Sequence, residues 1–345
     1  MQKKSSTIKR LVRDKAFPLL IILIVLLIAS MILSSGVLEG APLSAMFTKG
    51  FMAQQNLLAN FYKLVIQTFM LIGLGVILIS GNIDLSIAAQ ATLGSLIFAK
   101  LCQGTMPWGV ALIITLLIAI VFGLINTLLV NFFKFPAFIA TIGASSIYGG
   151  LCNVFTGGNN IQIARESFLK LGSAKVLGVF PVIFIISIVF LIVFQFILSK
   201  TRFGRSLFMA GGNPIAARLS GLKPDKLRMI LFLINSVMSV LGGILWSAQV
   251  KLASPTSIIA DAPNMTAISA AILGGIAFTG GSGNLIGPFI ALVLINSFES
   301  MLNVLQINAY YVVLAQGVLL LVALIIDFVS AERRRKAMIA AAANA

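Results

Sequence analysis

The sequence predicts an all-α membrane protein that crosses the bilayer about ten times. Three observations predict this class. Hydrophobic residues make up 59% of the 345 residues, charged residues make up only 10%, and the apolar residues form long continuous runs. As helices, such runs cover the ~30 Å of hydrocarbon in a bilayer, whereas a membrane β-barrel would show short alternating segments. We therefore expect a single transmembrane domain over residues 1–345.

The predicted spans follow one another between polar or charged intervals. A basic tail, residues 1–16, precedes the first span, and a second tail, residues 328–345, follows the last. No small-residue cleavage site follows the first apolar run, so we expect an uncleaved span rather than a signal peptide. Residues 37–63 and 156–180 are expected to be outer loops, the first with an interfacial helix. The ten predicted spans are residues 18–36, 64–80, 87–101, 107–133, 136–155, 181–198, 229–250, 265–278, 285–305 and 309–326.

The positive charges predict the orientation. The chain has 25 Lys and Arg against 9 Asp and Glu, and the basic residues cluster between the apolar runs. This distribution is typical of topology signals and not of a nucleic-acid surface. With both tails inside, 18 of the 25 Lys and Arg fall on the inner side. We therefore expect both termini and residues 200–228 to be cytoplasmic.

Residues 200–228 form the longest polar interval, with Asp225 as its one acid. Asn213 followed by Pro214 predicts a helix start, with Asn as the N-cap and Pro at the first helical position, and Gly221 predicts its end. A basic turn that only fixes orientation needs no capped helix with apolar side chains. We therefore expect a docking element for a cytoplasmic partner.

Asp84 lies in a short polar break, GNIDLS, between two apolar runs. An ionisable group at membrane depth is energetically expensive and needs a partner. The favoured interpretation is a helix cap, in which Ser86 or free backbone amides satisfy the carboxylate. The second interpretation is a proton or substrate ligand.

Two further segments are rich in small residues. PAFIATIG, residues 136–143, predicts a helix start at Pro136 followed by close helix packing, and a role of Thr141 or Tyr148 in lining a path is secondary. Residues 268–288, ISAAILGGIAFTGGSGNLIGP, lack the Lys of a phosphate-binding loop. We interpret them as a tight helix crossing and a sharp turn at the inner face.

These four segments resemble the bacterial ABC-type monosaccharide permeases, the ribose and galactose group of the branched-chain amino acid and sugar permease superfamily. The resemblance covers about residues 67–327, and its most specific part is TRFGR…AGGNPIAARLSGL. NIDLS is similar to the family's GIDLSVG signature, with Asn82 and Ala88 where Gly is usual. The family's acidic pair before the Gly-rich run is replaced by Asn264 and Thr266, so no role of those acids carries over.

The resemblance implies the fold and the partners. It implies a type II importer domain like that of the vitamin B12 permease, in which spans two to five and seven to ten form an inverted pseudo-repeat. It also implies a second permease copy, as a homodimer or a heterodimer, a periplasmic or lipid-anchored sugar-binding protein, and a separate ATPase subunit that binds ATP and Mg²⁺. This chain would bind no cofactor itself and would lie in the bacterial inner membrane. The residues implied in ATPase coupling are Arg205, Gly211, Gly212, Asn213, Pro214, Ala217, Arg218, Leu219 and Gly221.

Polar residues within the spans are candidates for a sugar path, because sugars need planar hydrogen-bonding groups and an aromatic face. Several of them would instead bond helix to helix, at ~0.6 kcal/mol each on average. The candidates are Asp84, Gln67, Gln90, Asn126, Thr141, Tyr148, Asn235 and Asn296.

Enzymatic chemistry is disfavoured by the residue types. The chain has no His, and Cys102 and Cys152 lie fifty residues apart, so neither a zinc site nor a Cys–His nucleophile is expected. The two thiols either pair near the outer helix ends or are separate core residues. The predicted function is the permease subunit of an ATP-driven sugar importer. The alternatives are a proton-coupled carrier that uses Asp84, or an ABC permease for a nucleoside or a branched-chain amino acid.

Overall fold

The computed structural model describes residues 16–308 without a gap, followed by 310–315, 317–318, 321, 325, 329 and 332. The predicted basic tails and the tenth predicted span, 309–326, lie outside the described residues except at those positions.

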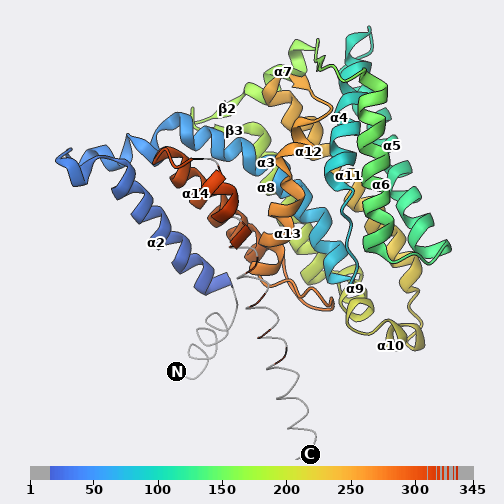
Figure 1. Cartoon of the computed structure of the whole chain (residues 1–345). Coiled ribbons are helices and arrows are strands. Elements are labelled where there is room, and N and C mark those ends of the chain that lie inside the picture. Colours follow the sequence, from blue (N-terminus) through green and yellow to red (C-terminus); the bar gives the residue numbers. More distant parts are fainter. Residues whose placement is uncertain are drawn as a thin grey trace, which may run out of the picture.

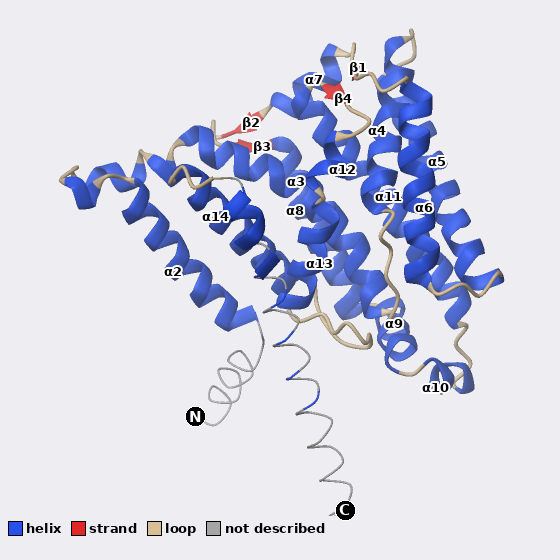
Figure 2. Ribbon diagram, viewed as in Figure 1, coloured by secondary structure: helices blue, strands red, loops and turns tan. Residues whose placement is uncertain are grey.

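The described chain is a bundle of helices with a few two-residue strands (Figure 1) (Figure 2). Strand β1 (Ile161–Gln162) pairs antiparallel with β4 (Leu252–Ala253), and β2 (Lys175–Val176) pairs with β3 (Phe180–Pro181). The helices are α2 (Ala16–Ser34), η1 (Val37–Glu39), η2 (Leu43–Phe47), η3 (Gly50–Met52), α3 (Gln54–Ile79), α4 (Ile87–Gln103), α5 (Trp108–Thr127), η4 (Leu128–Phe132), α6 (Ala137–Thr156), α7 (Glu166–Ser173), α8 (Val182–Lys200), α9 (Arg202–Gly212), α10 (Pro214–Leu219), α11 (Pro224–Val250), α12 (Ser257–Asp261), α13 (Pro263–Leu273) and α14 (Ile286–Val304).

The prediction of an all-α membrane protein is confirmed. The described residues contain 7 helices long and apolar enough to cross a membrane: Pro18–Glu39, Gln54–Ile79, Trp108–Phe132, Ala137–Thr156, Val182–Lys200, Pro224–Val250 and Ile286–Val304. Helix α4 has only 17 residues, or about 25 Å. The non-helical residues 82–86 before it add at most ~17 Å, so together they are long enough to cross. The total of ten spans stays a prediction.

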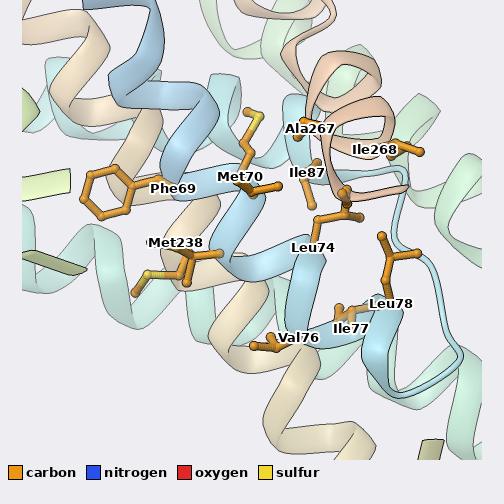
Figure 3. Close-up of a cluster of buried hydrophobic side chains, with 14 of the residues drawn as sticks. Phe69, Met70, Leu74, Val76, Ile77, Leu78, Ile87, Met238, Ala267 and Ile268 are labelled. Atoms are coloured by element: carbon orange, nitrogen blue, oxygen red, sulfur yellow. The ribbon is translucent and has the colours of Figure 1, made fainter. Parts of the chain in front are cut away.

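Helix α3 is the centre of the bundle. In its most apolar stretch 89% of the residues are buried, against 17% in the first span. It packs along α11, which runs in the opposite direction, and α4 to α6 lie on one side of this pair while α14 and α2 lie on the other (Figure 1). Figure 3 shows Phe69, Met70 and Leu74 of α3 in the core, near Met238 of α11 and Ala267 of α13.

Glycines bring several helices into backbone contact. A Cβ at position 123 of α5 would lie 2.8 Å from the Cα of Leu233 in α11. A Cβ on Gly274, directly after α13, would overlap Pro288 of α14, which confirms the tight crossing predicted for residues 268–288. Close packing predicted for the small residues of α6 is only partly right, because Ala140 is buried but Gly143 faces open space.

Several predicted boundaries were wrong. Helix α3 begins ten residues before the predicted residue 64, because its first turns carry a polar face that contacts α14. Residues 37–53 form three 3-10 turns rather than an interfacial α-helix. The interval 200–228 holds two helices, α9 and α10, and its last residues already belong to α11. Cys102 and Cys152 are both buried and unpaired.

Candidate functional site

The carboxylate of Asp84 is fully buried and accepts hydrogen bonds from three directions. Its Oδ1 accepts from the backbone N of Ser86 at 2.8 Å and from the Ser86 hydroxyl at 2.6 Å. Its Oδ2 accepts from Nδ2 of Asn126 on α5 at 3.1 Å and from Nδ2 of Asn235 on α11 at 2.9 Å. Since a buried polar group is costly unless it is hydrogen-bonded, these contacts hold the non-helical segment 82–86 against two helices.

Further polar side chains extend this junction, which we call the Asp84 network. Gln90 of α4 donates to the Ser86 hydroxyl at 2.6 Å. Tyr148 of α6 donates to Oδ1 of Asn126 at 3.4 Å, and the Thr141 hydroxyl accepts from the backbone N of Leu85 at 3.1 Å. The structure therefore brings together six of the eight predicted path residues, Asp84, Gln90, Asn126, Thr141, Tyr148 and Asn235.

The network corrects the favoured interpretation of Asp84. Ser86, not Asp84, occupies the N-cap position of α4. Asp84 lies two residues earlier and binds the amide of Ser86, so the predicted partner was right and the capping position was wrong. The six network residues are all buried, and their hydrogen bonds give them a packing role here. Their role in a sugar path stays a prediction.

The other two path candidates meet in a second polar cluster between α3 and α14. Nδ2 of Asn296 donates to Oε1 of Gln67 at 2.6 Å. Toward the start of α3, Asn60 donates to the Ser300 hydroxyl at 2.9 Å, and Lys63 forms an ion pair with Glu299. These side chains line a cavity of about 120 Å³, which we call the outer polar cavity, formed by Asn56, Ala59, Asn60, Lys63, Asn296, Glu299, Ser300 and Asn303.

A smaller cavity of about 30 Å³ shares Lys63 with the outer polar cavity. Gln67, Trp246 of α11 and Asp261 also line it. The two cavities thus combine amide, carboxylate and ammonium groups with one indole ring, the set of contacts that a small polyhydroxy molecule needs. Sequence reasoning missed this cluster because it assigned residues 54–63 to a loop. The signal that could have found it is the helical spacing of Asn56, Asn60, Lys63 and Gln67, which places four polar residues on one face.

Helix α10 has the start and end that the sequence predicted. Oδ1 of Asn213 accepts from the backbone N of Ala216 at 3.0 Å, and Pro214 is the first helical residue. Gly221 follows the C-cap with φ +82. The helix has 6 residues, which is less than two full turns. Of the remaining coupling candidates, Arg205 is exposed on α9, Ala217 is buried, and Arg218 pairs with Asp225 at 3.3 Å.

Two large apolar side chains of α10 are mostly exposed to solvent. Ile215 is 72% exposed and Leu219 is 85% exposed. Figure 2 places α9 and α10 at the lower end of the bundle, opposite α7 and the two strand pairs. An exposed apolar pair on a short rigid helix is typical of a protein contact.

A glycine junction fastens α9 to the membrane helices. At Gly211, a Cβ would overlap the carbonyl oxygen of Ile79, the last residue of α3. The backbone N of Gly281, in the loop between α13 and α14, donates to the same oxygen at 2.8 Å. Gly81, two residues after Ile79, lies against Gly280. Because Gly81 begins the segment that carries Asp84, the surface helices and the Asp84 network are connected through backbone contacts.

Comparison with known proteins gives one family. Residues 56–324 match the model of the permease component of branched-chain amino acid transport systems. The ribose import permease protein RbsC of Haemophilus influenzae is 29% identical over 287 residues, which cover 82% of this chain and 88% of the relative. The ribose import permease protein RbsC of Bacillus subtilis is 28% identical over 80% of this chain and 86% of the relative. The autoinducer 2 import system permease protein LsrC of Escherichia coli is 28% identical over 80% of each chain. No solved structure matches the chain.

We predict that Asp84→Asn destabilises the protein far less than Asp84→Ala. An Asn side chain keeps an oxygen for Ser86. A flip of the Asn235 amide would turn its Oδ1, which has no partner among the described residues, toward the new amide so that it can accept a hydrogen bond. Alanine leaves the buried donors of Ser86 and Asn235 unsatisfied, at about 1–3 kcal/mol each, and Asn126 keeps only its bond to the Ser86 hydroxyl. The measurement is the temperature at which each purified variant loses its monodisperse elution peak. Equal losses in both variants would show that the negative charge holds the junction.

A second prediction uses neighbouring glycines at the end of α9. Gly211→Ala forces the backbone away from Ile79, whereas a Cβ at Gly212 would lie an ordinary 3.8 Å from Gly281. We expect Gly211→Ala to lower the thermal midpoint, with a cost of about 1–3 kcal/mol, and Gly212→Ala to match the wild type. Limited proteolysis after Arg205 gives an independent readout, because a displaced α9 is cut faster. If both variants have the same thermal midpoint and cleavage rate, the close approach at Gly211 does not contribute to stability.

Proposed function

The chain belongs to the family of permease components of branched-chain amino acid transport systems, and from this we propose that it is the membrane subunit of an ATP-driven importer for a simple sugar. It is a transport subunit, and ATP hydrolysis takes place on a separate subunit. ATP and Mg²⁺ therefore bind to that partner rather than to this chain. Family membership also argues against the alternative of a proton-coupled carrier.

The observation that carries the choice of substrate is the outer polar cavity. Its volume of about 120 Å³ is well below the ~300–1,000 Å³ typical of drug-sized ligands, so it suits a small molecule better than a nucleoside. Seven of the eight residues that line it have polar side chains, which the hydrophobic side chain of a branched-chain amino acid would desolvate without offering them a hydrogen bond. Hydroxyl groups, in contrast, can replace the bonds that Asn60 and Ser300 now make to each other. Two relatives are named for ribose and a third for autoinducer 2, which supports a small polyhydroxy substrate.

The charge distribution supports the orientation that we propose. Basic residues are concentrated around α9, α10 and the start of α11, which favours a cytoplasmic location of this end. Both termini then lie in the cytoplasm of a bacterium, and the outer polar cavity opens away from it, toward a periplasmic or lipid-anchored binding protein. The exposed side chains of Ile215 and Leu219 would enter a groove of the ATPase subunit.

The packing supports a type II importer domain with ten spans and an inverted repeat. The long buried helices α3 and α11 run in opposite directions, as inverted repeats require. Each is followed by a non-helical segment, 82–86 or 251–256, and then by a short helix. The outer face of α6 has open space beside Gly143 and Gly150. We propose that this face packs on a second copy of the permease, as a homodimer, since small residues let membrane helices approach closely.

The test of the substrate is ATP hydrolysis by the reconstituted complex of permease, ATPase and binding protein in liposomes. We expect stimulation by one member of a panel of pentoses, hexoses and autoinducer 2, and none by nucleosides or branched-chain amino acids. Asn60→Leu removes the donor to Ser300 from the outer polar cavity. It should lower substrate uptake roughly fivefold, as expected for the loss of one hydrogen bond of about 1 kcal/mol.

The matched control is Gln55→Leu, an exposed residue in the first turn of α3 that does not line the cavity. It should transport like the wild type. Stimulation by leucine alone, or equal uptake by the two variants, would reject the sugar assignment.

We also predict that Leu219→Glu disconnects the ATPase subunit. A carboxylate in an apolar groove is expensive to desolvate, and a central anchor of an interface carries at least ~2 kcal/mol. Co-purification of the ATPase should fall at least about tenfold, while the permease keeps its elution profile because Leu219 is exposed. Leu177, 86% exposed between β2 and β3 at the opposite end, provides the control. Leu177→Glu should leave ATPase binding unchanged, and an intact complex with Leu219→Glu would make α10 a topology signal only.

A further inference from the structure

One cavity formed by the described residues is not part of the proposed path. It is a groove of about 550 Å³ between the lower part of α5, with its continuation η4, and the start of α11. Leu124, Leu128 and Phe132 form its exposed wall and Met229 belongs to its other side. Its lining is almost entirely apolar, and only its lower edge carries charged side chains, Asp225 and Lys226.

The groove is a fixed feature because the two helices touch above and below it. Above it, Gly123 lets α5 approach the backbone of α11 at Leu233. Below it, Nδ2 of Asn131 donates to the carbonyl oxygen of Asp225 at 2.7 Å, and Arg228 donates to Oδ1 of Asn131 at 3.1 Å. The two contacts are eight residues apart on α5, about 12 Å of helix. Between them the helix turns into the π-helix η4, which is a rare form that is frequent at functional sites.

The lower edge of the groove is positively charged. Asp225 is neutralised by Arg218 at 3.3 Å and by Arg228 at 3.9 Å. Lys226 lines the groove, is exposed, and has no ion pair within the described part of the chain. With Lys223 nearby, the edge has an excess of positive charge where α11 leaves the apolar layer.

We propose that this groove binds one anionic phospholipid, with an acyl chain between α5 and α11 and the phosphate at Lys226. Apolar walls at membrane depth fit a hydrocarbon chain, and a basic pocket between membrane helices at the proposed cytoplasmic face fits an anionic head group. A protein surface is a poorer fit, because an opposing helix would have to bury Lys226, which has no ion pair within the described residues. Since Asp225 joins Arg218 of α10 to the start of α11, the lipid phosphate lies beside the ion pair that braces the docking helix.

The test is lipid binding by the full chain in mild detergent, measured by native mass spectrometry with phosphatidylglycerol and phosphatidylcholine of the same acyl chains. One charge contact near the surface gives about 1 kcal/mol, so the wild type should retain phosphatidylglycerol about fivefold better. Lys226→Gln should abolish this preference, and Lys175→Gln, an exposed lysine of β2, should keep it. Neither sugar nor ATP enters the measurement, so its failure would leave the proposed transport function untouched.

A second pair of variants tests the groove itself. Leu124→Trp fills it and should reduce binding of both lipids, whereas Leu117→Trp, on the exposed side of α5 two turns away, should not. Equal retention of the two lipids by the wild type would overturn the proposal, as would a preference that survives Lys226→Gln. Unchanged binding by Leu124→Trp would mean that only annular lipid is present. Loss of self-association in that variant, with lipid binding intact, would assign the groove to a second copy and equally reject a lipid site.

Discussion

The structure depends on finding hydrogen-bond partners for an interrupted helix backbone in the water-free interior of the bilayer. Residues 82–86 interrupt the helices at the centre of the bundle, and their polar groups need protein partners. Asp84 supplies the solution, because one carboxylate accepts from its own segment, from α5 and from α11. The surrounding helices are placed by that requirement. Gly123, where α5 meets α11, lies one turn from Asn126, so close packing and polar contact reinforce each other.

Local signals in the sequence predicted local structure well. The apolar runs predicted most of the described spans, and Asn213, Pro214 and Gly221 predicted the start and end of α10, since caps depend on neighbouring residues only. The same reasoning failed where distant residues decide. Nothing near Asp84 indicates that Asn126 and Asn235 are its partners. The polar first turns of α3 were assigned to a loop because their stabilising contacts come from α14.

The glycine junction connects the surface helices α9 and α10 to the Asp84 network. Gly211 brings α9 against Ile79, the last residue of α3. Gly81, two residues after Ile79, directly precedes the segment 82–86 that contains Asp84. These are backbone contacts without intervening side chains, so α9 lies directly against the core. The loop between α13 and α14 shares the contact through Gly281, so α14, the helix that carries Asn296 and Glu299, begins close to the same junction.

The long reach of the Asp84 network also has a consequence for biogenesis. Asn235 lies 151 residues after Asp84, so the ribosome needs roughly 8 to 30 s at 5–20 residues per second to deliver this donor. Until α11 emerges, Asp84 lacks the hydrogen bond from Asn235 and α3 lacks the helix against which it packs. A chain that stops before α11 would lack the Asn235 donor permanently.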